Sequence, residues 1–150
     1  MIAQQQSYGQ NLWAADRYDW IEQTLQEFLR DRSAAAAVHP HDVARIIAYV
    51  HANLFDSSLN VSVLKLRCQL RNNNVTTRFR RAVGMGLREY IEKLRLEAAA
   101  RLLEQREIAV YLVAMAVGYE HYETFFRAFQ RHFGCTPSEV RLRGAAWADA

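Results

Sequence analysis

Two segments 50 residues apart end in the same pattern, and this internal repeat restricts the fold more than any other feature. The phenylalanine, the arginine two positions later and the closing glycine are shared by residues 79–84 (FRRAVG) and residues 129–134 (FQRHFG). An apolar residue, Val75 or Phe125, precedes each phenylalanine by four positions, which is the spacing of one helix face. The sequence therefore contains two copies of a helix that ends at glycine.

The rest of the chain is predicted to be helical as well. Only 2 prolines and 6 glycines occur among 150 residues, of which 51% are hydrophobic. A sandwich or barrel would need more turn residues, and a disordered chain would contain far less apolar surface. We therefore predict an all-α fold. Apolar spacing places helices at about 16–30, 42–55, 61–69, 73–83, 87–105, 108–116 and 121–133, and a capping box (TPSE, 136–139) begins one more.

Each repeat is preceded by a short helix and a tight connection, which is the arrangement of a helix-turn-helix unit. A linker helix of about 19 residues would be roughly 28 Å long, close to the ~34 Å between successive major-groove segments of DNA. The predicted organisation is an N-terminal extension (1–40, ending in a junction before Pro40), a domain (41–143) and a C-terminal tail (144–150). Within the domain we expect one unit at about 61–83, the linker helix at about 87–105 and the other unit at about 108–133.

Two details of packing can be predicted. Glu89 with Lys93, and Glu97 with Arg101, have the spacing of ion pairs along the linker helix. The N-terminal helix has an apolar stripe that it cannot bury alone, so it must pack on the rest of the chain or on a second copy.

Charge is distributed unevenly along the chain. Residues 1–40 contain 3 basic and 5 acidic residues, whereas residues 41–150 contain 16 and 11. Between Ser57 and Arg88 there are seven basic residues and no acidic one. Of the 19 basic residues 17 are arginines, whose planar guanidinium suits phosphates and base edges. This distribution predicts a surface that binds a polyanion, with a solvated helix face as the alternative.

Patterns typical of other protein classes do not occur in the sequence. Cys68 and Cys135 form no CxxC pair, and His39 and His41 have no further ligand at a metal-site spacing. There is no glycine-rich phosphate loop, GxSxG or HExxH motif, and we expect no signal peptide. The uncharged, mostly apolar run at 108–119, of 12 residues, is too short to cross a bilayer. We therefore expect a cytoplasmic, non-enzymatic protein without metal, cofactor or membrane contact.

Residues 118–141 (GYEHYETFFRAFQRHFGCTPSEVR) resemble the signature of the AraC/XylS transcription regulators. Tyr119 replaces the phenylalanine of the family's Gly-Phe pair, and residues 125–130 match its aromatic and basic core. The closing Gly-x-Thr-Pro-x-x-x-Arg pattern is matched by Gly134, Thr136, Pro137 and Arg141. The likeness extends over about 41–143. It implies a double helix-turn-helix domain that binds double-stranded DNA, and an activator role with RNA polymerase as partner.

The first unit departs from the family pattern at Lys65, Gln69 and Arg71. One of the asparagines at 72–74 would then have to cap the second helix of that unit.

The resemblance also implies which side chains contact DNA. Base contacts are expected from the second helix of each unit: Asn73, Asn74, Thr76 and Thr77 in the first, and Tyr122, Glu123, Thr124 and Arg127 in the second. Arg127 suits a bidentate guanine contact, and asparagine can contact adenine. Phosphate contacts are expected from Arg78, Arg80, Arg81 and Arg131. The alternative for each is an exposed polar side chain without a role.

Two other functions are left open by the sequence. One is a helical protein-interaction module. The other is a regulator fragment with degenerate DNA binding, in which the N-terminal helix is either a cap over the domain or a remnant that forms a homodimer.

Overall fold

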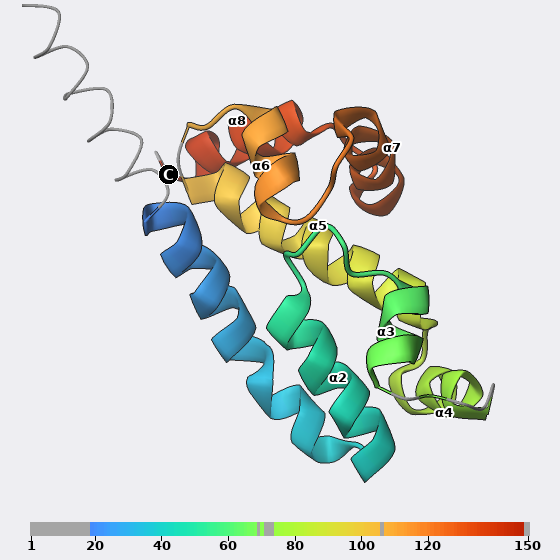
Figure 1. The fold of residues 1–150 in the computed structure, drawn as a ribbon. Coiled ribbons are helices and arrows are strands. Elements are labelled where there is room, and N and C mark those ends of the chain that lie inside the picture. Colours follow the sequence, from blue (N-terminus) through green and yellow to red (C-terminus); the bar gives the residue numbers. More distant parts are fainter. Residues whose placement is uncertain (1–18, 69, 71–73, 106, 149–150) are drawn as a thin grey trace, which may run out of the picture.

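The structure, a computed structural model, describes residues 19–68, 70, 74–105 and 107–148 (Figure 1). These residues form helices and short connections without any strand, which confirms the predicted all-α fold. An N-terminal helix is described over residues 19–32. It is followed by η1 (Ser33–Val38), α2 (His41–Asn53), α3 (Val61–Arg67), α4 (Asn74–Val83), α5 (Leu87–Gln105), α6 (Val110–Ala116), α7 (Tyr122–Phe133) and α8 (Pro137–Ala148).

The helix ends follow local signals in the sequence. Gly84, Gly118 and Gly134 have φ angles of 88°, 104° and 72°, the left-handed region that ends a helix at low cost only for glycine. The predicted capping box is present at the start of α8. There the Thr136 amide donates to the Glu139 carboxylate at 2.9 Å, and the Glu139 amide donates to the Thr136 hydroxyl at 3.3 Å.

Two segments differ from the sequence prediction. Residues 33–38, expected to be a plain junction, form the 3₁₀-helix η1, whose Ala36 packs against the core. Alanine favours helical backbone, and 3₁₀ turns are common at the end of an α-helix. Helix α8 continues to Ala148, so most of the segment expected as a C-terminal tail is helical.

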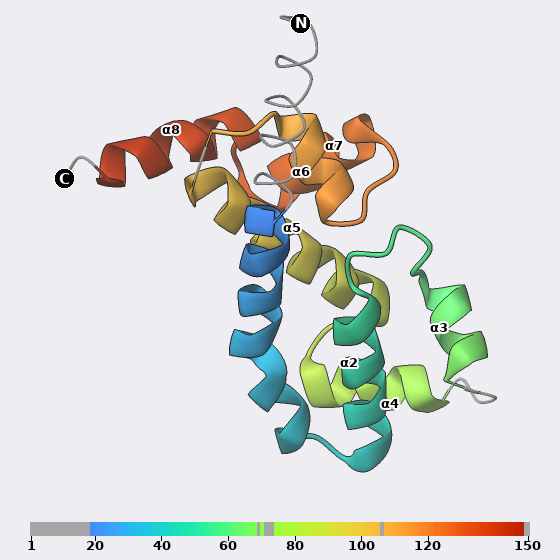
Figure 2. The same cartoon turned by 60° about the vertical axis from the view of Figure 1, so that its left-hand side comes forward.

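Helix α5 is the centre of the molecule. In Figures 1 and 2 it runs between the first unit, with α2, α3 and α4, and the second unit, with α6, α7 and α8. Residues on a broad face of α5 are buried: Leu87, Ile91, Leu94, Arg95, Leu96, Ala98, Ala99, Leu102 and Leu103. Such a broad buried face is expected for a helix that has neighbours on several sides. Helix α5 therefore forms the shared core of both units.

The N-terminal helix packs within the chain. It lies beside α2 in both views (Figures 1 and 2). Its Ile21, Leu25 and Phe28 are buried. The rings of Phe28 and Phe55, which follows α2, are 6.4 Å apart. Of the two arrangements left open by the sequence, the structure therefore shows packing on the rest of the chain.

The predicted ion pairs along α5 are not the ones that the structure shows. Glu97 pairs with Arg32 at 3.0 Å and with Lys93 at 3.9 Å, and Arg101 pairs with Asp31 at 2.9 Å. The charges of the N-terminal helix lie opposite those of α5 and provide closer partners.

Candidate nucleic-acid interface

Helix α4 divides into a buried and an exposed face. Val75 and Phe79 point into the first unit, where the Phe79 ring meets the Tyr90 ring of α5 edge-on at 5.5 Å. The predicted DNA-contacting residues are on the other side: Asn74, Thr77, Arg78, Arg80 and Arg81 are exposed and Thr76 is half-buried. Asn73 and the suggested cap residue Asn72 lie outside the described residues.

Helix α7 repeats this division in the second unit. Phe125, Ala128 and Phe129 are buried, and the Phe125 ring meets the Tyr119 ring edge-on at 5.4 Å. The four predicted base contacts, Tyr122, Glu123, Thr124 and Arg127, are all exposed. Three of them occupy the first turn of the helix, the part of a recognition helix that contacts base edges. The repeat in the sequence thus corresponds to two exposed helix faces.

The four arginines expected to hold phosphates fall into two groups. Arg80 and Arg81 are exposed, and neither is in an ion pair with a described residue. Arg78 pairs with Asp42 of α2 at 2.8 Å, and Arg131 pairs with Glu92 of α5 at 2.7 Å. Two of the four guanidinium groups are therefore already bound to carboxylates of neighbouring helices.

Sequence reasoning assigned no role to Arg95, which joins the two units. Its side chain is buried in α5, where Nε donates to the Leu54 carbonyl and Nη2 to the Asp56 carbonyl, both at 2.8 Å. These carbonyls belong to the loop after α2. On its other side the guanidinium lies against Gly118, and its Cζ is 5.9 Å from the centre of the Tyr119 ring. One side chain of the linker helix thus touches both units.

The electrostatics of this junction follow from burial. Burial lowers the pKa of Arg95, and three backbone carbonyls within 2.8–3.4 Å stabilise its charge. Burial, followed by the nearby Glu92 charge, raises the pKa of Tyr119 to about 12. The junction is therefore a fixed cation beside a neutral phenol. In the sequence, an arginine between two leucines, Leu94 and Leu96, was the signal for it.

The described residues show no arrangement typical of other site types. No group of three or more His, Cys, Asp or Glu side chains within those ranges is placed to hold a metal ion. The two cysteines are free thiols, and burial raises the pKa of Cys68. None of the described helices has the length and apolar character needed to cross a membrane.

Two helix-turn-helix units on one linker helix, each exposing its second helix, define the class of double helix-turn-helix proteins. Residues 67–143 match the protein family described as "Helix-turn-helix domain". Regulatory protein SoxS of Escherichia coli (strain K12) is 31% identical over 105 residues, which cover 70% of this chain and 97% of SoxS. The chain belongs to the AraC/XylS family of DNA-binding helix-turn-helix transcription regulators.

Longer relatives match over part of their length. The Msm operon regulatory protein of Streptococcus mutans is 24% identical over 139 residues, which cover 90% of this chain and 49% of that protein. The F1 operon positive regulatory protein of Yersinia pestis is 30% identical over 100 residues, which cover 67% of this chain and 33% of that protein. The chain thus spans half or less of these two curated relatives.

Solved structures show the same fold. The C-terminal domain of AraT, a response regulator from Geobacillus stearothermophilus, superposes with a TM-score of 0.66 at 23% identity, covering 69% of this chain and 86% of that one. The DNA-binding domain of AdpA, solved in complex with a target DNA, superposes with a TM-score of 0.65 at 24% identity. The match covers 71% of this chain and 96% of that one.

Proposed function

We propose that this protein is a sequence-specific regulator that inserts α4 and α7 into successive major-groove segments of one DNA duplex. The observation that carries the proposal is the pair of exposed helix faces held by one buried linker helix. Figure 1 shows α4 and α7 on the same side of the molecule, α7 above α4. Helix α5 has 19 residues, roughly 28 Å, which is close to the ~34 Å between successive groove segments.

Base contacts are assigned to side chains at or near the starts of the two helices. On α7 these are Tyr122, Glu123, Thr124 and, one turn later, Arg127. Arg127 is exposed and, among the described residues, in no ion pair, so its guanidinium is available for a bidentate contact with guanine. On α4 the assigned residues are Asn74, Thr76 and Thr77, together with Asn73 before the helix.

Phosphate contacts are assigned to Arg80 and Arg81, whose guanidinium groups are exposed. Arg78 and Arg131 join them in this proposal, but each must share its charge with Asp42 or Glu92 or exchange that carboxylate for a phosphate. Phosphate contacts orient the protein on the duplex without carrying sequence information.

The activator role and the contact with RNA polymerase are also part of this proposal. They are supported by the names of relatives, such as the F1 operon positive regulatory protein and the transcriptional activator RclR of Escherichia coli. A homodimer is not needed, because one chain presents both helices. The apolar face of the N-terminal helix packs inside the chain, so a homodimer would have to use another surface.

The test starts from duplexes selected by the protein from a random-sequence pool. Binding of Arg127→Ala and Arg80→Ala is then measured on the selected duplex and on an unrelated duplex, at several salt concentrations. We expect Arg127→Ala to lose about tenfold or more on the selected duplex and little on the unrelated one. Arg80→Ala should lose affinity on both and reduce the salt dependence by about one phosphate contact.

Arg30→Ala is the matched control, because Arg30 is exposed on the N-terminal helix, which lies across the molecule from α4 and α7 in Figure 1. It removes the same charge and should leave both affinities nearly unchanged. Equal losses of Arg127→Ala on the two duplexes would contradict the base contact. A protein that shifts no duplex at low or moderate salt would instead be the protein-interaction module.

A further inference from the structure

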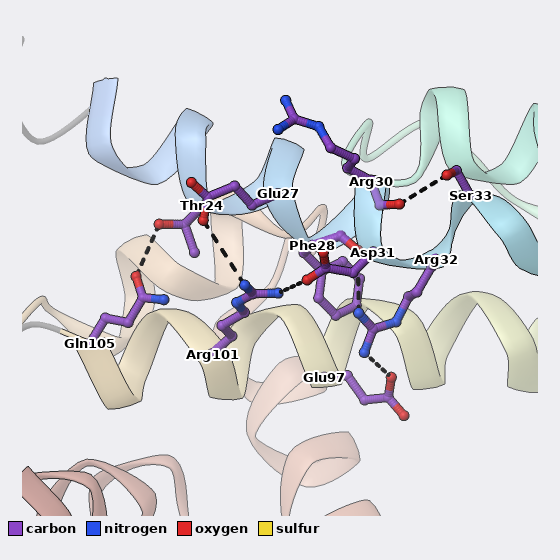
Figure 3. A network of polar contacts seen from close by, with 10 residues as sticks. All are labelled: Thr24, Glu27, Phe28, Arg30, Asp31, Arg32, Ser33, Glu97, Arg101 and Gln105. Carbon is purple, nitrogen blue, oxygen red and sulfur yellow. Dashed lines mark hydrogen bonds and ion pairs between the residues drawn. The ribbon is translucent and has the colours of Figure 1, made fainter.

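A polar seam joins the N-terminal helix to the C-terminal half of α5 (Figure 3). The seam consists of Thr24, Glu27, Asp31 and Arg32 on one helix and Glu97, Arg101 and Gln105 on the other. The Thr24 hydroxyl donates to the Gln105 amide oxygen at 3.1 Å. The Arg101 guanidinium lies 2.9 Å from the Asp31 carboxylate and 4.0 Å from the Glu27 carboxylate. The Arg32 guanidinium lies 3.0 Å from the Glu97 carboxylate.

The order of these contacts fixes one register between the two helices. Glu97, Arg101 and Gln105 are four residues apart and share one face of α5, over roughly 12 Å. Their partners run in the opposite direction along the N-terminal helix, from Arg32 back to Thr24. A slip of one turn would place Arg32 opposite Arg101 or Asp31 opposite Glu97. Like charges would then meet, so the seam disfavours other registers.

The seam covers an apolar contact that includes the first unit. Phe28 is 1% exposed and packs against Phe55, in the loop whose Leu54 and Asp56 carbonyls bind Arg95. The Arg32 guanidinium lies 3.6 Å from the centre of the Phe28 ring and also donates to the Phe28 carbonyl at 3.2 Å. Arg32 thus takes part both in the apolar contact around Phe28 and in the polar seam.

The N-terminal helix therefore contacts both the first unit and the linker helix. It lies beside α2 of the first unit, and its seam lies on the half of α5 that leads into α6 (Figures 1 and 2). The matched family region begins at residue 67, so this helix precedes it. A helix that holds the linker against the first unit restricts how far the second unit can turn relative to the first.

We propose that the N-terminal helix is a brace that fixes the linker helix and thereby sets the spacing at which α4 and α7 engage two DNA half-sites. This inference rests on the proposed two-segment binding. When two binding elements are held at a matching distance, the second contact is favoured by a high effective concentration, which is lost when their geometry loosens. The brace residues touch no DNA and act as positioning residues.

The test reverses one charge of the seam. Asp31→Arg places a cation opposite Arg101, and adding Arg101→Glu to it restores an ion pair of opposite polarity. Glu22→Arg is the matched control, because Glu22 is exposed on the same helix and contacts Gln26 of that helix. It changes the net charge by the same amount, so any general attraction to DNA is equal. Hydrogen exchange of the amides at 97–105 reports whether the brace has loosened.

Affinity is measured on three probes derived from the duplex that the wild-type protein selects. One is that duplex, one has a single half-site replaced by unrelated sequence, and one has about 5 base pairs, half a helical turn, inserted between the half-sites. We expect Asp31→Arg to lose about three- to tenfold on the intact duplex and less than twofold on the single half-site. It should also discriminate less between the intact and the expanded duplex, and the double variant should recover both properties.

Four results would overturn the brace. Unchanged affinity for the intact duplex despite faster exchange in α5 would show that the spacing of α4 and α7 on DNA does not depend on this helix. Equal losses on the intact and single half-site duplexes would show that the helix only stabilises the fold. Tighter binding by Asp31→Arg would make the helix an inhibitory cover. If the wild-type protein gains nothing from a second half-site, two-segment binding itself fails, and the brace fails with it.

Discussion

The guanidinium of Arg95 lies directly against the backbone of Gly118, where a Cβ atom would come within 2.9 Å of Nε and 3.1 Å of Cζ. Gly118 follows α6 in the turn of the second unit, and Arg95 belongs to the linker helix. The same guanidinium binds carbonyl groups of the loop after α2. The absence of a side chain at one glycine thus allows the linker helix to hold both units at once.

Replacement of Gly118 by alanine should therefore destabilise the protein strongly. The residue has a φ of 104°, which is unfavourable for alanine, and the new methyl group would displace Arg95. We expect the free energy of unfolding in urea to fall by about 3 kcal/mol. Gly84→Ala is the control, since Gly84 also has a positive φ of 88° but nothing within 4 Å of its Cβ position. In Gly84→Ala the free energy of unfolding should fall only by the cost of alanine at a positive φ, about 1–2 kcal/mol.

Equal losses for the two glycine variants would mean that Arg95 moves aside without cost. The contact between Arg95 and Gly118 would then not contribute to the coupling of the two units.

Replacement of Arg95 by lysine should also destabilise the protein, although the charge is kept. The planar guanidinium reaches the carbonyls of Leu54 and Asp56 with two different nitrogens, which a single ammonium group cannot do. A carbonyl left without a partner in this buried place lowers the free energy of unfolding by about 2 kcal/mol. Arg88→Lys, at an exposed position of the same helix, should change it by less than about 0.5 kcal/mol. Equal stability of the two variants would contradict the role given to Arg95.

The sequence predicted the helices well where local signals determine them. The bounds of α5 agree with the prediction at both ends, and α8 begins at the predicted capping box, because periodicity and caps act over a few residues. The two exposed faces of α4 and α7 also follow from the repeat. The 3₁₀-helix at residues 33–38 was not predicted, because Pro40 indicates where a helix ends but not which conformation the residues before it adopt.

The partners of charged side chains could not be predicted from spacing alone. Glu97 and Arg101 have the spacing of a pair along α5, yet each binds a residue about 65 to 70 positions away on the N-terminal helix. Arg131 has the appearance of a phosphate contact in the sequence, but Glu92 lies opposite it in the fold. Long side chains select partners from whichever helices pack beside them, so tertiary structure decides.

Release of Arg131 from Glu92 should strengthen DNA binding if Arg131 contacts a phosphate. Glu92→Gln removes the carboxylate that holds the guanidinium at 2.7 Å and leaves an amide of the same shape. We expect about two- to fivefold tighter binding to the selected duplex and a steeper salt dependence. Binding is measured by fluorescence anisotropy at several salt concentrations.

The control for this prediction is Glu89→Gln, since Glu89 is exposed on the same helix and the substitution changes the net charge equally. A gain of the same size in both variants would reflect net charge alone. Weaker binding by Glu92→Gln would show instead that the ion pair orients α7 against the linker helix, with Arg131 as a structural residue.

The stability of the first unit should fall on mild acidification because of His51. Its Nε2 lies 2.9 Å from the Tyr90 hydroxyl, between α2 and α5, and the two rings stack. Burial, followed by the charge of Arg32, lowers the pKa of His51 below its ordinary 6.5. The unfolded chain therefore binds the proton more tightly. The free energy of unfolding should be highest above pH 6.5 and decrease as the pH falls through and below that value.

Urea unfolding between about pH 8 and about pH 5 measures this decrease. His51→Gln, which can still bind Tyr90, should lose less stability over the same interval, whereas His132→Gln, at an exposed position, should follow the wild-type curve. Parallel curves for the wild-type protein and His51→Gln would show that His51 does not carry the effect.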